Sequence, residues 1–161
     1  MSINFPRQAI RLRVLIRILL VCWASPNSLI GLCVGLAGIL SGGKLRLSHG
    51  CLEFYGGLVE RGLRRLGVAG MTLGHTILGQ TSEGLNFVRD HEHVHVRQYE
   101  RWGPLFLPAY LGWSAWLWLK GKDCYRLNPF EIEAYAQHDP AAEAAAQARA
   151  AEMKREDNQR E

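Results

Sequence analysis

Residues 84–102 read GLNFVRDHEHVHVRQYERW, and this stretch decides the fold because it combines a long amphipathic pattern with three of the six histidines. Five side chains recur at spacings of three and four residues, which places them on one face of an α-helix: Val88, His91, His95, Tyr99 and Trp102. Gly103-Pro104 then ends the pattern with residue types that terminate helices. The sequence therefore predicts a helix from about 84 to 102 with one buried face.

The same helix carries the motif H-E-x-x-H. His91 and His95 are four residues apart, so both imidazoles project from one face and can bind one tetrahedral zinc ion. Glu92 is the candidate general base, because it stays close enough to take a proton from a zinc-activated water. His93 faces the opposite side. The alternative is a chance match in a histidine-rich surface helix, but a buried imidazole pair needs partners, which a metal supplies.

A catalytic zinc site needs a third protein ligand, and two acids are available in the later stretch Asn128-Pro129-Phe130-Glu131-Ile132-Glu133. Glu131 and Glu133 lie about 200° apart on a helix, so only one can face the histidines. We expect Glu131, which shares its face with Ala134 and Tyr135, and keep Glu133 as the alternate ligand. The competing interpretations are a capping box for Glu131, with Asn128 as N-cap, and a solvated charge for Glu133.

These motifs resemble the gluzincin metallopeptidases, in which H-E-x-x-H is followed by a glutamate on a later helix, often within E-x-x-A-D. Here residues 131–135 read EIEAY, with Tyr135 in place of the aspartate that supports a ligand histidine. H-E-x-x-H-x-x-Q followed by N-P-x-E-x-E-A looks closer still to small bacterial zincin-like domains. The resemblance implies peptide hydrolysis, with residues 71–78 forming a cleft strand that binds an extended peptide.

The sequence indicates the residues that would assist the catalytic site less specifically than it indicates the ligands. Tyr135 or Tyr99 would donate a hydrogen bond to the oxyanion that forms when water attacks a carbonyl, although core packing is the alternative role for both. Gln98, one turn beyond His95, would line the cleft or lie exposed. His75 is a weaker ligand candidate than Glu131.

No charged residue occurs from Ile18 to Gly43, and this run is long enough to span a bilayer. Ser25-Pro26 has the form of a helix start, so we expect two short apolar helices joined as a hairpin. A signal peptide and a buried hairpin of a soluble protein are the alternatives. A second charge-free run, 102–119, is rich in tryptophan and suits an interfacial position.

The net charge of +4 is unevenly distributed, because no acidic residue precedes Glu53. Basic residues that border apolar runs favour an anionic membrane surface as partner, with a peptide or protein as substrate. Nucleic acid ranks lower, since no nucleic-acid motif is present. The four cysteines form no C-x-x-C pair, so they are poor metal-ligand candidates. The oligomeric state stays open.

Residues 44–48 and 51–55 alternate polar and apolar side chains, and 71–78 is a third strand candidate. We therefore expect an α+β fold with a small antiparallel sheet packed on the metal-binding helix. The expected divisions are an apolar membrane-associating segment (1–43), a zincin-like domain (44–138) and an alanine-rich charged tail (139–161). The predicted function is a membrane-associated zinc metallopeptidase. The sequence leaves its orientation in the membrane open, and we expect the active-site domain in the cytoplasm. The alternative is a non-catalytic membrane-associated domain with a structural or vestigial zinc site.

Overall fold

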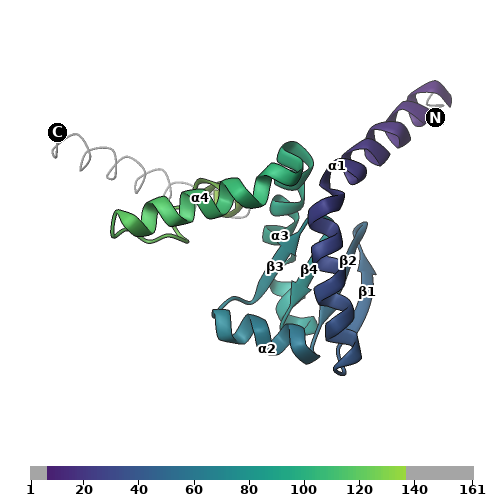
Figure 1. Cartoon of the computed structure of the whole chain (residues 1–161). Coiled ribbons are helices and arrows are strands. Elements are labelled where there is room, and N and C mark those ends of the chain that lie inside the picture. Colours follow the sequence, from purple (N-terminus) through teal and green to yellow (C-terminus); the bar gives the residue numbers. More distant parts are fainter. Residues whose placement is uncertain (1–6, 137–161) are drawn as a thin grey trace, which may run out of the picture.

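The computed structural model describes residues 7–136, which form an α+β fold as the sequence predicts (Figure 1). The predicted tail at 139–161 lies outside the described residues. In chain order the elements are α1 (Arg7–Leu40), β1 (Lys44–Ser48), β2 (Cys51–Tyr55), α2 (Gly57–Leu66), β3 (Gly70–Leu73), β4 (Thr76–Gly79), α3 (Ser82–Trp102), the 3-10 turn η1 (Gly103–Leu105), α4 (Phe106–Leu119) and α5 (Pro129–Ala136).

The four strands form one mixed sheet in the order β1-β2-β4-β3, rather than the antiparallel sheet that the sequence suggested. Two antiparallel hairpins, β1–β2 and β3–β4, are joined by a parallel pairing of β2 with β4. The parallel pair arises because α2 crosses over between the hairpins. The predicted strand 71–78 is itself a hairpin, since Gly74 takes a φ of +64° and turns the chain. This order leaves β3 at an edge of the sheet.

The sheet is a layer between α1 and α3 (Figure 1). Side chains alternate between its two faces. Phe54 of β2 packs against α1, where a Cβ added at Gly35 would lie 2.4 Å from its ring. Its neighbour Glu53 points to the other face and pairs with Arg89 of α3. The small residues of α1 therefore serve close packing against the sheet.

Helix α1 is one continuous helix through Pro26, so the predicted hairpin is wrong. A proline inside a helix removes the hydrogen bond to the carbonyl four residues earlier. Here that carbonyl belongs to Cys22, and the Ser25 hydroxyl donates to it at 2.7 Å. Asn27 also donates its side-chain amide to the Gly103 carbonyl at 3.1 Å, which anchors α1 beside η1. The chain therefore passes the proline without turning back.

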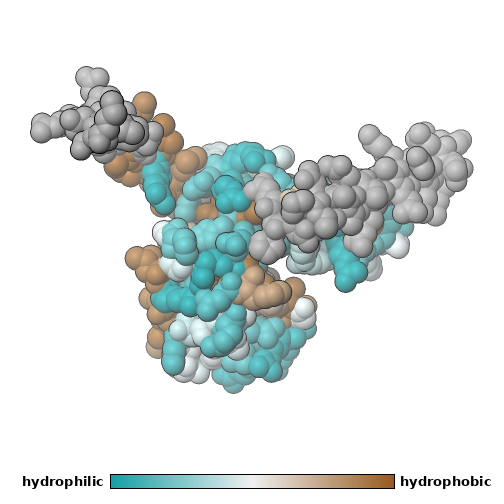
Figure 2. Space-filling model, turned by 180° about the vertical axis from the view of Figure 1, so that it is seen from behind, coloured by the Kyte–Doolittle hydropathy of each residue, from teal (hydrophilic) through white to brown (hydrophobic). Residues whose placement is uncertain are grey.

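Two helices carry much exposed apolar surface. In α1, residues Val14–Leu40 are long and apolar enough to cross a membrane, and among the described residues no other helix is. Helix α4 is apolar on all sides, yet only Phe106 and Leu117 are buried in it. Figure 2 shows brown, hydrophobic atoms along α1 at the upper left, next to the grey terminus.

Candidate metal centre

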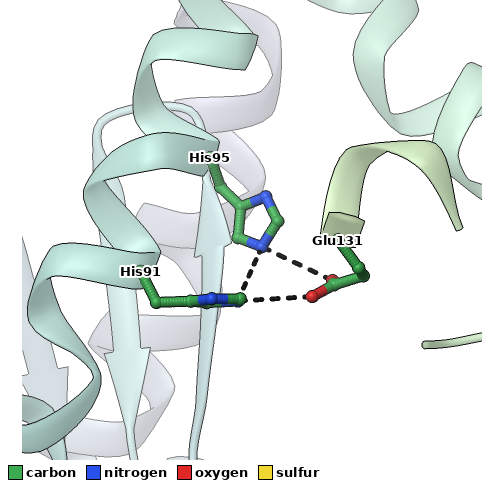
Figure 3. Close-up of side chains that lie close together, drawn as sticks. All are labelled: His91, His95 and Glu131. Atoms are coloured by element: carbon green, nitrogen blue, oxygen red, sulfur yellow. Dashed lines mark hydrogen bonds and ion pairs between the residues drawn. The ribbon is translucent and has the colours of Figure 1, made fainter. Parts of the chain in front are cut away.

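Helix α3 positions the two motif histidines. It begins two residues before the predicted boundary, at Ser82, where the Thr81 side chain caps it by accepting a hydrogen bond from the Gly84 amide at 3.0 Å. It ends before Gly103, whose φ of +56° few other residues adopt. His91 and His95 project from neighbouring turns of α3 toward the start of α5 (Figure 3).

Glu131, from the first turn of α5, completes a three-residue cluster (Figure 3). Its Oε2 lies 3.3 Å from Nε2 of His91, and its Oε1 lies 3.4 Å from Nε2 of His95. The two Nε2 atoms are 3.2 Å apart. This group could hold a metal ion.

The spacing of these atoms fits a tetrahedral ion. Ligand atoms that bind such an ion at about 2.0–2.1 Å lie about 3.3–3.4 Å apart, and the three measured separations span 3.2–3.4 Å. Oε2 of Glu131 is also buried, and Nε2 of His91 contacts it at 3.3 Å without good hydrogen-bond geometry. A cation at the cluster would satisfy this oxygen better.

Electrostatics within the cluster keep the carboxylate charged. Burial raises the pKa of Glu131, but the neighbouring imidazoles of His91 and His95, followed by the Tyr110 hydroxyl, outweigh it and bring the pKa to about 2. Burial lowers the pKa of His95, yet the neighbouring Glu131 carboxylate reverses the shift and raises it. The site therefore presents an ionised carboxylate, the form that binds a metal.

Asn128 fixes the start of α5. Its Oδ1 accepts from the Phe130 amide at 3.1 Å, and its Nδ2 donates to the Tyr110 carbonyl and the Ser114 hydroxyl. Its own backbone N–H bonds to the Tyr125 carbonyl. The capping-box interpretation of Glu131 therefore fails, because the N–H that the glutamate would accept is already bonded.

Gln98 is fully buried and lies against His95, in contrast to the exposed position that we considered for it. Its Oε1 is 2.8 Å from Nδ1 of His95, so an N–H at Nδ1 fixes the ring and directs Nε2 toward the cluster, where its lone pair would meet a bound metal. Its Nε2 donates to the Phe130 carbonyl and to Glu133. Glu133 lies away from the cluster and pairs also with Arg101. Glu133 thus holds Gln98 in place. The contact between Gln98 and His95 could have been anticipated from the sequence, because residues three apart are neighbours on a helix.

Glu92 is buried beside the edge strand. Thr72 of β3 donates to its Oε2 at 2.7 Å, and burial raises the pKa of its carboxyl. A Cβ added at Gly70 would lie 2.7 Å from Oε1 of Glu92, so this glycine lets β3 approach the carboxylate closely. Glu92 and the three cluster residues line one cavity of about 190 Å³. The remaining walls are mainly apolar and come from β3 and α4.

The tyrosines divide by role. Tyr110 of α4, which belongs to no sequence motif, donates to Oε1 of Glu131 at 2.7 Å. Tyr99 is buried and packs on Phe106, which fits the core role. Tyr135 packs against the His91 ring at 4.7 Å, and its hydroxyl lies 3.4 Å from that of Tyr125. Tyr110 and Tyr125 line the cavity, and its described lining does not include Tyr135.

The other three histidines among the described residues lie outside the cluster. His75 pairs with Glu100, and His93 faces His49 on another side of α3.

No protein-family model, curated protein or solved structure matches this chain.

Proposed function

We propose that the protein is a membrane-associated, zinc-dependent metallopeptidase. The observation that carries the proposal is the tetrahedral spacing of the His91, His95 and Glu131 ligand atoms in a cavity that also contains Glu92. Two histidines and one glutamate are a known ligand set of catalytic zinc, which leaves a fourth position for water or substrate.

Each neighbouring residue has a distinct task in this proposal. Zinc would supply Lewis-acid chemistry that makes a water acidic near neutral pH. Thr72 occupies Oε2 of Glu92, so Oε1 is the oxygen that would take the proton from water and later pass it to the leaving amine. The raised pKa of Glu92 suits this task, since it brings the carboxyl closer to the pH at which it works.

The edge strand β3 supports an extended peptide as substrate. Residues 70–73 line the cavity, and β4 occupies only one side of this strand. The backbone groups on the other side would pair with a peptide by strand addition. Of the predicted cleft strand 71–78, only the β3 part has this free edge, because β4 lies between β2 and β3.

Zinc content and peptide cleavage, measured together, test the proposal. Wild type should bind about one zinc per chain, and His91→Ala should lose it. Glu92→Gln should keep zinc but lose cleavage of a mixed peptide library followed by mass spectrometry. Asp90→Asn, an exposed acid on the same helix, is the matched control and should change neither.

Two outcomes would contradict the proposal. Equal zinc content in wild type and His91→Ala would remove the metal site itself. Stoichiometric zinc without any cleavage that depends on Glu92 would favour the non-catalytic alternative, in which the metal is structural or vestigial.

Membrane association in this proposal rests on α1 and α4. Trp113, Trp116 and Trp118 are exposed on α4, and Lys120 lies over the Trp116 ring at 5.9 Å, an arrangement suited to the interface with anionic lipid. Deleting residues 1–43 would uncover the sheet, so Trp116→Ser with Trp118→Ser is the cleaner test. The two substitutions together should reduce flotation of the protein with anionic vesicles. Unchanged flotation would contradict a membrane role for α4.

A further inference from the structure

A second cavity, of about 130 Å³, lies on another side of α3 from the metal cluster. Its walls come from α1, the β1–β2 turn, the β3–β4 turn and α3. The residues that matter are mostly basic or imidazole side chains: Arg17, His49, His75, His93, Arg97 and Glu100. None of them takes part in the proposed peptidase chemistry.

Unpartnered polar atoms mark this cavity. Among the described residues, three buried side-chain nitrogen or oxygen atoms have no hydrogen-bond partner. One is Oε2 of Glu131 in the metal cluster, and the other two are Nδ1 of His75 and Nε2 of His93, both from residues that line this cavity. A buried polar atom without a partner is costly, so these two ring nitrogens leave hydrogen-bonding capacity that a ligand in the cavity would use.

The charges around the cavity favour an anion. The Arg17 guanidinium lies close to Gly50, 3.0 Å from where a Cβ would be, and its positive charge acts on the neighbouring Cys51 thiol. Arg97 adds a second guanidinium. Glu100 is the only carboxylate in the described lining, and His75 Nε2 holds it at 3.1 Å.

The turn between β1 and β2 places a further imidazole at this cavity. His49 and Gly50, with φ of +49° and +82°, are the two residues of this hairpin turn, which requires positive φ at both positions. The turn brings the His49 ring within 5.5 Å of the His93 ring.

A second metal fits this cavity poorly. Among the described residues, the only three potential ligand side chains that converge closely enough for one ion are His91, His95 and Glu131. Guanidinium groups bind no metal, whereas they form paired hydrogen bonds with phosphate oxygens.

We propose that this cavity binds a phosphate group, with Arg17 and Arg97 on its oxygens and the Nε2–H of His93 as a further donor. The group is either a soluble phosphate or the headgroup of an anionic lipid. The position of Arg17 and Val21 on the apolar helix α1 makes the lipid headgroup accessible to the same cavity.

Titration of the full-length, detergent-solubilised protein with inorganic phosphate, followed by calorimetry, tests the proposal. Arg17→Gln and His93→Gln should each weaken phosphate binding roughly tenfold or more, since each removes a hydrogen bond to a charged group. Arg65→Gln, an exposed arginine on α2, is the charge-matched control and should bind phosphate like wild type. Zinc content should stay unchanged in all three variants.

A vesicle arm separates the two sources. Flotation with vesicles of phosphatidylcholine plus phosphatidic acid, against phosphatidylcholine alone, should depend on Arg17 more than on Arg65 if the ligand is a headgroup. If flotation depends equally on Arg17 and Arg65, the ligand of the cavity is a soluble phosphate rather than a lipid headgroup. Wild type that binds no inorganic phosphate, or variants that bind it like Arg65→Gln, would overturn the proposal. A second zinc equivalent that His93→Gln removes would also overturn it, because the cavity would then be a metal site.

Discussion

Replacing Gln98 by methionine isolates the residue that orients His95. Methionine fills a similar volume but removes the 2.8 Å contact with Nδ1 of His95 and the two bonds from Nε2. The imidazole would then lose the partner that fixes its ring and tautomer. Partners of metal-binding histidines typically contribute 10–100-fold to metal affinity, so we expect the zinc Kd to rise by about that factor, or about 1.4–2.7 kcal/mol.

The assay is competition for zinc with a chromogenic chelator, together with the visible spectrum of the cobalt-substituted protein. The spectrum reports the coordination geometry around the metal. A general loss of folding stability would leave that geometry unchanged. Gln80→Met is the matched control, because Gln80 also donates a hydrogen bond, to the Val68 carbonyl at 2.8 Å, but contacts no ligand histidine. It should lose stability without losing zinc affinity.

Glu133→Gln completes the series. A glutamine at 133 can still accept from Gln98, so the zinc Kd should change little if Glu133 only holds Gln98 in place. A large loss in this variant would show that Glu133 is the ligand after all. Equal zinc affinities for Gln98→Met and Gln80→Met, with identical cobalt spectra, would refute the orienting role.

Three further outcomes follow from the contacts. Burial raises the pKa of Glu53, but hydrogen bonds from two arginines lower it overall. The stability that the Glu53 carboxylate contributes is therefore complete above the ordinary pKa of 4.5 and is lost as pH falls toward the lower folded-state pKa. Acid unfolding should accordingly be less steep in Glu53→Gln. Gly35→Ala should lower the free energy of unfolding by about 1–3 kcal/mol in urea titrations, because its methyl would collide with Phe54. Tyr110→Phe should weaken zinc binding modestly, by about tenfold or less, since Glu131 loses one donor but keeps its place.

The sequence alone could predict helix α3 and the shared face of His91 and His95, because both depend on spacing within one segment. Side chains four residues apart share a helix face whatever the rest of the chain does. The same local logic predicted Asn128 as the start of α5. It also preferred Glu131 to Glu133, and the structure places Glu131 beside the histidines, while its role as a ligand stays a prediction.

Local patterns were insufficient where distant segments meet. The Ser25-Pro26 signal predicted a break, yet the Ser25 hydroxyl and the packing of α1 on the sheet keep one helix. The β2–β4 pairing is parallel because α2 crosses over between the two hairpins, a path that strand alternation does not encode.

The surroundings of the site were likewise decided by tertiary structure. Gln98, Tyr110 and Thr72 are ordinary polar residues in the sequence, and each gains its role only by meeting a partner from another element. The motif determined which side chains share the face of α3. The packing of α4, α5 and β3 against that face decided which partners orient them, because hydrogen bonds over a few ångströms depend on where the whole chain places both atoms.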